Sequence, residues 1–181
     1  MPTRRRLSTR NYWLNLFTGT TWQKFLDTGA EVSGFRKKKR LRTFMRMKPG
    51  DYLLCYLTGI SRFIGVLEVV SDPFLDHSPM WESEEFPCRV RVKVIVSLTP
   101  ETAVPVLELK EQLSFLQNCE SPHAWKGYFR GSPTQWEAAD GGAVLRALKE
   151  AARSPVIRPV DQSKLARRPV PPKSQRQPQS I

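Results

Sequence analysis

The sequence predicts an α+β fold in which a sheet curls into a small barrel. Three observations carry the prediction: a central pair of apolar runs, a later run that alternates charged and apolar residues, and short segments with helical spacing. The chain has 181 residues, of which 40% are hydrophobic, and this length suffices to bury one good core. We therefore expect one domain.

The central element is a predicted β-hairpin at 48–71. Turn residues at 48–51 precede a strand-length apolar run from Tyr52 to Leu57, and a second run extends from Phe63 to Val70. The two runs are joined by a short connection that contains Gly59, which is typical of a hairpin. Because both runs are too apolar to leave a face in water, we place this hairpin in the core of the sheet.

The residues before the hairpin predict one strand and two short helices. Residues 11–17 form the strand, in which Trp13 and Asn15 share a face. Thr20 or Thr21 can cap a helix that Gly29 ends. A helical turn is expected at 41–47.

The residues after the hairpin predict a long strand, two helices and a tail. Phe86 to Leu98 alternates in the manner of a half-buried strand. Residues 107–116 have helical spacing, 117–132 form a loop, and a last helix is expected from Pro133-Thr134 to about Arg153. The expected organisation is a basic N-terminal arm at 1–10, a domain at 11–153 and a disordered basic tail, rich in Pro, Arg and Gln, at 154–181.

Positive charge is concentrated in three segments. The net charge is +12; residues 1–10 carry four Arg and no acid, residues 153–181 carry seven basic residues and one acid, and residues 36–42 carry six basic residues. Localised positive charge is typical of surfaces that meet phosphates. For the two tails, a role in solubility alone stays open.

The sequence shows no feature of a membrane protein or of a disulfide-rich secreted protein. No apolar run has the length of a bilayer span, and the basic start of the chain lacks the apolar stretch of a signal peptide. The three cysteines are scattered, which fits reduced thiols. We expect a soluble cytoplasmic protein without a membrane partner, and a monomer, because no heptad or exposed apolar stripe is evident.

No catalytic constellation emerges from the sequence. Cys55 lies inside the apolar hairpin and Cys88 at a strand start. Cys119 and His123 are four residues apart, but no third group is evident to orient the histidine. The sequence holds no CxxC or HExxH motif and no phosphate-binding glycine loop, so we expect no metal and no cofactor.

An ordered series of short motifs provides the most specific signal. The series consists of Tyr12-Trp13-Leu14-Asn15, Trp22, Gly34-Phe35 with the basic run, Lys48-Pro49-Gly50-Asp51, Tyr56, Phe63 to Val69, Pro87-Cys88-Arg89-Val90, Leu113-Ser114-Phe115-Leu116 and Gly127 to Gly131. It resembles the EVE domain family, a branch of the PUA-like superfamily related to YTH and ASCH domains, over roughly residues 11–152.

The resemblance implies a PUA-like barrel of five or six strands with short flanking helices. It also implies a pocket for a nucleobase, in particular a modified one, turned out of its nucleic acid. YTH relatives read methylated adenine in RNA, and EVE domains are linked to modified cytosines in DNA.

A flipped base needs a flat apolar wall and a few polar groups for its edge. We expect Trp13 to form the wall and Asn15 to bond the base edge, since an amide both donates and accepts. Around them we expect a lip of Ser33, Gly34 and Phe35, a floor of Tyr56, Leu57 and Thr58, and a far side of Phe129, Arg130, Gly131 and Ser132. Phosphates are expected to meet Arg36, Lys37, Lys38, Lys39 and Arg40.

Ordinary structural roles stay open for some of these residues. Trp13 and Tyr56 could be core residues. Arg130 could pair with an acid of the 82–85 loop.

These observations predict a non-catalytic nucleic-acid-binding module that reads a methylated or hydroxymethylated base flipped into an aromatic pocket. DNA with a modified cytosine is the favoured partner, and RNA stays open. Two alternatives would use the same pocket: an enzyme that modifies nucleotides or RNA through Cys119 or His123, and a sensor of a small nucleobase-like molecule.

Overall fold

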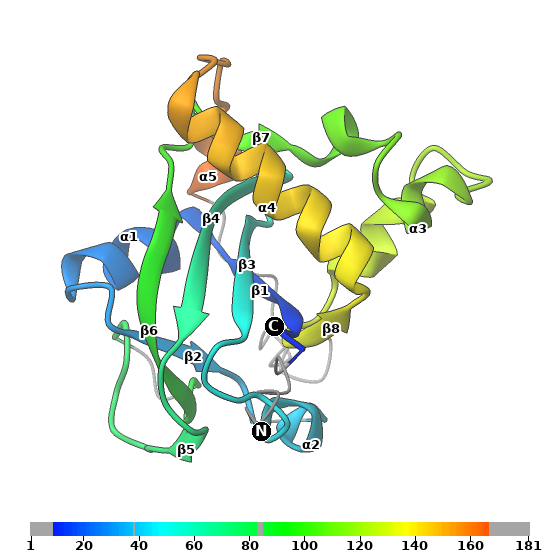
Figure 1. Ribbon diagram of the computed structural model, residues 1–181. Coiled ribbons are helices and arrows are strands. Elements are labelled where there is room, and N and C mark those ends of the chain that lie inside the picture. Colours follow the sequence, from blue (N-terminus) through cyan, green and yellow to red (C-terminus); the bar gives the residue numbers. More distant parts are fainter. Residues whose placement is uncertain (1–8, 38, 83–84, 167–181) are drawn as a thin grey trace, which may run out of the picture.

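The computed structural model describes residues 9–37, 39–82 and 85–166 (Figure 1). Most of the expected N-terminal arm, Lys38 and the last part of the expected tail therefore lie outside the described residues.

A strongly curled half-barrel sheet forms the centre of the molecule (Figure 1). Its main path runs through β2 (Val32–Phe35), β6 (Cys88–Ser97), β4 (Arg62–Val69), β3 (Tyr52–Leu57), β1 (Tyr12–Phe17) and β8 (Thr134–Trp136). Two short strands join this path, β5 (Phe74–Leu75) on β6 and β7 (Val104–Pro105) on β4. The expected α+β fold with a curled sheet is confirmed.

The helical elements surround the sheet. They are α1 (Gly19–Asp27), α2 (Leu41–Phe44), η1 (Val106–Leu109), α3 (Ser114–Gln117), η2 (Ala124–Phe129), α4 (Ala138–Arg153) and α5 (Gln162–Leu165). The longest, α4, crosses one face of the sheet and contacts β1, β3, β4 and β6 (Figure 1). Within the described ranges, every helix is too short or too polar to cross a membrane.

The predicted hairpin is confirmed as β3 and β4. All six residues of β3 are buried, and the two strands pair from Tyr52 opposite Glu68 to Leu57 opposite Arg62. Gly65 in β4 faces the carbonyl oxygen of Val96 and the ring of Trp22; an added Cβ would lie only 2.6 Å from that oxygen. This position therefore needs glycine.

Several local predictions are corrected. The cap of α1 is Thr18, which forms a reciprocal capping box with Thr21. The helical spacing at 107–116 corresponds to two short pieces, η1 and the start of α3, and η2 lies within the expected loop 117–132. Residues 134–136 form a strand instead of opening the last helix, because β1 offers its free edge to them.

Residues 154–166 are packed against the body, so the prediction of disorder from residue 154 onward is wrong for this part. Arg158 donates two hydrogen bonds to the carboxylate of Glu108, at 3.0 and 2.6 Å. Arg62 donates to the carbonyl oxygen of Pro159 at 2.7 Å, and Leu165 lies against Gly19. Polar contacts to distant residues hold this segment where apolar burial alone would not.

One buried carboxylate joins the starts of β1 and β3. Asp51 is fully buried and accepts hydrogen bonds from Trp13 Nε1 (2.9 Å), the backbone N–H of Asn11 (3.1 Å) and the backbone N–H of Lys48 (3.2 Å). Because β1 and β3 are parallel and far apart in sequence, no tight turn fixes their register. The carboxylate supplies that connection.

Asp51→Asn tests this connection. The substitution turns one acceptor into an N–H₂ group that faces a donor, so we expect it to lower the free energy of unfolding by about 2–3 kcal/mol. Urea unfolding checks this, with the exposed Asp72→Asn as control. Equal losses for the two variants would contradict the role of Asp51.

Candidate functional site

Trp13, the expected stacking wall, has no accessible ring face. Its side chain is fully buried, its Nε1 donates to Asp51, and the Arg46 guanidinium lies 5.9 Å from its ring centroid. The structure thus shows Trp13 as a core residue, the alternative that the sequence left open. The expectation that Trp13 stacks on a ligand disagrees with this geometry.

Asn15 and Ser33, two residues of the predicted pocket, lie in contact. Both side chains are buried, and Asn15 Nδ2 donates to Ser33 Oγ at 2.8 Å. The next residue, Gly34, lies against Met80 and Phe86, so the end of β2 adjoins the loop that contains Met80. Phe35 packs on Phe44 with the ring centroids 5.8 Å apart.

The expected floor and far side meet inside the core. Tyr56 and Phe129 stack with centroids 4.2 Å apart, and Leu57 is fully buried. Thr58 is exposed, and its hydroxyl lies 3.4 Å from the carbonyl oxygen of Phe17. Tyr56 and Phe129 therefore support the fold instead of presenting open ring faces.

Trp81 is a candidate residue that the sequence reasoning missed. Its ring packs against Phe17, Phe25 and Phe86, with centroids 5.6, 6.3 and 5.1 Å away; we call these four rings the Trp81 cluster. Trp81 Nε1 is the one buried side-chain nitrogen or oxygen that finds no hydrogen-bond partner within the described ranges. The only available sequence signal was a lone Trp in a polar loop.

The backbone beside this ring is unusual. Trp81 and Glu82 have φ angles of 54° and 61°, values in the left-handed region that non-glycine residues seldom adopt. Lys24 of α1 holds this backbone by donating to the carbonyl oxygen of Trp81 and by pairing with Glu82. Such strained backbone is concentrated at ligand sites.

The basic run, Arg36 to Arg40, begins beside the Trp81 cluster and ends beside the first residue of β8. Arg36 lies 5.7 Å from the Phe86 ring and pairs with Glu85 at 2.9 Å. Lys37 and Lys39 are exposed. At the other end, Arg40 Nη1 donates to Thr134 Oγ1 at 2.7 Å and to the Pro133 carbonyl oxygen at 3.2 Å.

Two further residues of the predicted pocket lie near the Arg40 end of the basic run. Arg130 is exposed and Ser132 is half-buried. The described acids of the 82–85 loop pair with other partners, Glu82 with Lys24 and Glu85 with Arg36. Arg130 is therefore not held by either of them.

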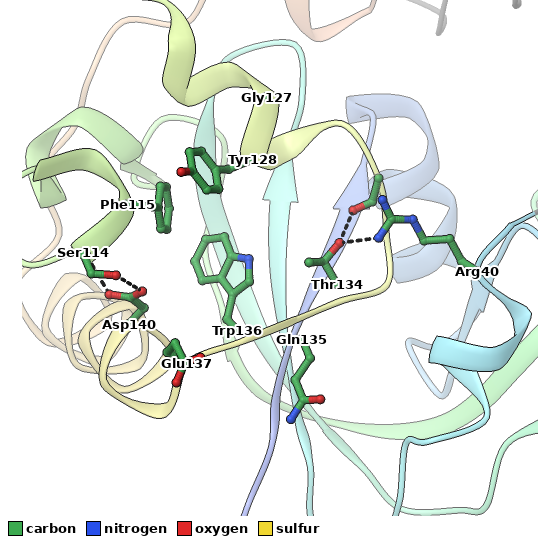
Figure 2. A pocket seen from close by; sticks show the side chains of 11 residues that line it. Arg40, Ser114, Phe115, Gly127, Tyr128, Thr134, Gln135, Trp136, Glu137 and Asp140 are labelled. Carbon is green, nitrogen blue, oxygen red and sulfur yellow. Dashed lines mark hydrogen bonds between the residues drawn. The ribbon is translucent and has the colours of Figure 1, made fainter. Parts of the chain in front are cut away.

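A cavity of about 430 Å³ opens where Arg40 meets β8. Figure 2 shows three aromatic side chains, Phe115, Tyr128 and Trp136, on one side of it and Arg40 with Thr134 on the other. None of the three rings belongs to the pocket expected from the sequence. We call the cavity lined by these rings, Arg40 and Thr134 the β8 cavity.

The three cysteines and the possible metal ligands were the sequence's candidates for nucleophilic or metal chemistry. Burial raises the pKa of the Cys55 and Cys88 thiols, which disfavours their reactive thiolates. Cys119 Sγ donates to the Phe115 carbonyl oxygen at 3.1 Å, and no hydrogen bond links it to His123 in the described part of the chain. The same residues contain no cluster of three or more His, Cys, Asp or Glu fit for a metal ion.

The curled sheet, with a short helix after its first strand and a long helix across one face, defines a PUA-like domain. A model of the EVE domain family matches residues 11–138, and the chain belongs to this family. The resemblance found in the sequence is confirmed.

Known proteins agree with this assignment. A UPF0310 protein of Pyrococcus abyssi is 29% identical over 133 residues, covering 67% of this chain and 87% of that protein. The YTH domain of mmi1, solved with RNA, is 17% identical with a TM-score of 0.57 and covers 83% of this chain and 89% of that one. The Zygosaccharomyces rouxii MRB1 YTH domain, solved with N6-methyladenosine RNA, is 15% identical with a TM-score of 0.53 and covers 82% and 94%. These YTH likenesses show a shared fold.

The pKa of Tyr56 allows a test of the core around its buried ring. Burial raises its pKa from 10 to about 12, although interaction with the Ser61 side chain lowers it. The folded-state pKa exceeds the unfolded one, so this stabilisation is complete below pH 10 and is lost as pH rises toward 12. Relative to Tyr56→Phe, the wild type should lose up to about 2–3 kcal/mol of unfolding free energy over that range. Urea unfolding at increasing pH measures this difference, and parallel curves would contradict it.

Proposed function

We propose that this protein is a non-catalytic module that binds nucleic acid and reads a modified base turned out of its strand. Its membership of the EVE domain family supports the proposal, as does the fold it shares with YTH domains solved with RNA. DNA carrying a methylated or hydroxymethylated cytosine is the first candidate partner, and RNA is the second.

The observation that carries the proposal is Trp81 Nε1, a buried donor without a hydrogen-bond partner among the described residues. A buried donor without an acceptor costs about 1–3 kcal/mol, and a ligand that supplies the acceptor recovers this energy. A nucleobase has such acceptors on its edge and a flat face that suits the surrounding rings. In the proposed complex the base takes a place in the Trp81 cluster and accepts a hydrogen bond from Trp81 Nε1, beside the strained backbone at Trp81 and Glu82.

Asn15 and Ser33 are proposed to complete the site. Their hydrogen-bonded side chains form a buried polar pair next to Gly34, which contacts Met80 beside Trp81. A base edge that reaches this pair finds both donors and acceptors. Trp13, anchored on Asp51, supports β1 from within the core and has no direct role in the proposal.

The exposed cations of the basic run are proposed to bind the backbone of the strand. Arg36 adjoins Phe86 of the Trp81 cluster, and Lys37 and Lys39 project from the same loop. Contacts of this kind add affinity that does not depend on sequence and that falls steeply with salt. Selectivity for a modified base must therefore come from the cluster.

Trp81→Phe tests the proposal, because it keeps an aromatic ring but removes the indole N–H together with part of the ring surface, a loss of size that the Trp125→Phe control shares. Matched short DNA and RNA strands would be titrated plain, with methylated or hydroxymethylated cytosine, and with N6-methyladenine, at two salt concentrations. We expect the wild type to prefer one modified strand at both salt concentrations. Trp81→Phe should reduce that preference by up to about tenfold. Trp125→Phe, which removes an indole N–H bonded to the Pro122 carbonyl oxygen, is the matched control.

Three outcomes would contradict the proposal. If all strands bind with equal affinity and that affinity falls steeply with added salt, binding is due to the basic segments alone. Binding of a free nucleobase as tightly as the strand would indicate a small-molecule sensor. An unchanged preference in Trp81→Phe would remove this residue from the site.

A further inference from the structure

The β8 cavity has the character of a second aromatic site. Phe115 and Tyr128 stack with centroids 4.4 Å apart, and Trp136 meets Phe115 edge-on at 5.0 Å. Tyr128 is 48% exposed, so one flat ring of this group faces solvent. The rings come from three elements, α3, η2 and β8, and lie on one side of the cavity (Figure 2).

The rear of this aromatic group is rigid. Trp136 packs against Phe63 and Phe129, with centroids 5.9 and 5.6 Å away. The buried carboxylate of Asp140 accepts hydrogen bonds from the backbone N–H and the hydroxyl of Ser114, at 2.8 and 2.7 Å, and thereby fixes α3 to α4. A rigid platform loses little conformational entropy when a flat ligand stacks on it.

Three polar side chains of the cavity keep hydrogen-bonding groups without a partner in the described part of the chain. Trp136 Nε1 donates to no residue there, and the exposed Glu137 carboxylate accepts from none. Arg40 makes both of its hydrogen bonds through Nη1, so Nη2 and Nε retain free donors there. The cavity thus offers a neutral donor, an anionic acceptor and a cation around a ring surface.

We propose that the β8 cavity receives a second nucleobase, that of a nucleotide near the modified one in the same strand. This inference rests on the proposed function. The basic run supports it, because Arg36 reaches the Trp81 cluster while Arg40 lines the β8 cavity, so one backbone following the run passes both aromatic sites. Arg40 binds a phosphate, the exposed Tyr128 ring stacks on the base, and Glu137 accepts a hydrogen bond from an amino group of the base.

The charges of the site select the class of ligand. Aromatic rings beside a carboxylate can also surround a methylated ammonium group. Here Arg40 lies in the lining and the whole chain carries a net charge of +12, so a basic peptide would be repelled. The acceptor on Glu137 favours cytosine, adenine or guanine over uracil or thymine, which lack an exocyclic amino group.

Tyr128→Ala tests the stacking contact without disturbing the core, since the ring is half-exposed. The probes are short single strands with a central 5-methylcytosine, or N6-methyladenine in RNA, in which one neighbouring nucleotide at a time is made abasic. One abasic position should weaken wild-type binding about tenfold. In Tyr128→Ala the intact strand should show the same loss, and the abasic change should add nothing. Tyr128→Phe, which keeps the ring, should bind like the wild type.

Glu137→Gln tests the edge contact in the same strands. At the position that the abasic series identifies, the wild type should prefer cytosine over uracil by about tenfold. Glu137→Gln should lose most of this preference, because a glutamine amide can accept from the cytosine amino group but can also donate to the carbonyl oxygen of uracil. The residue is exposed, so the variant should fold normally.

The outcomes separate this inference from the proposed function. Selectivity for the modified base, with losses from Tyr128→Ala and the abasic change that simply add, would overturn the second base site alone. Coupled losses without any selectivity for the modified base would support the second site and overturn base reading. Displacement of the strand from wild type, but not from Tyr128→Ala, by millimolar tetramethylammonium would overturn the inference in favour of a cation site.

Discussion

The buried carboxylate of Asp51 is the contact on which the rest of the structure depends. It receives donors from Asn11, Trp13 and Lys48 and so sets β1 beside β3 without a connecting turn. The register that follows places Asn15 opposite Cys55 and Phe17 opposite Leu57. Asn15 can then reach Ser33, and Phe17 can pack on Trp81. Both halves of the proposed base site, the Asn15–Ser33 pair and the Trp81 cluster, therefore depend on one buried carboxylate directly before β3.

The basic run connects two aromatic sites of different character. The Trp81 cluster is closed, contains a buried donor with no acceptor in the described ranges and lies beside strained backbone. The β8 cavity is open, and its rings already face a space of about 430 Å³. A closed site can select a ligand because entry must displace packed rings, whereas an open site adds affinity for whichever base stacks there. Together, the two sites would give the module selectivity for one base and additional affinity for the strand.

The sequence predicted the parts of this account that rest on local patterns. The hairpin follows from two apolar runs and a turn, and the resemblance to the family placed Asn15 and Ser33 in one pocket without predicting the hydrogen bond between them. Trp81 escaped prediction because a single aromatic residue in a loop has no periodicity. The strand at β8 depends on the free edge of β1, and residues 154–166 depend on contacts such as Arg158 with Glu108, fifty positions away. Such long-range partners are not encoded in any local window.

Indole N–H signals of the five Trp residues, followed by ¹H–¹⁵N NMR during titration, test the central claim most directly. A strand with the preferred modified base should shift the Trp81 signal strongly, because the Trp81 N–H, which has no acceptor among the described residues, gains one. The same strand should leave the signal of Trp13, already bonded to Asp51, in place. The matched unmodified strand should move Trp81 far less. If Trp81 stays unmoved with the modified strand, or moves equally with both strands, the base is not read in the Trp81 cluster.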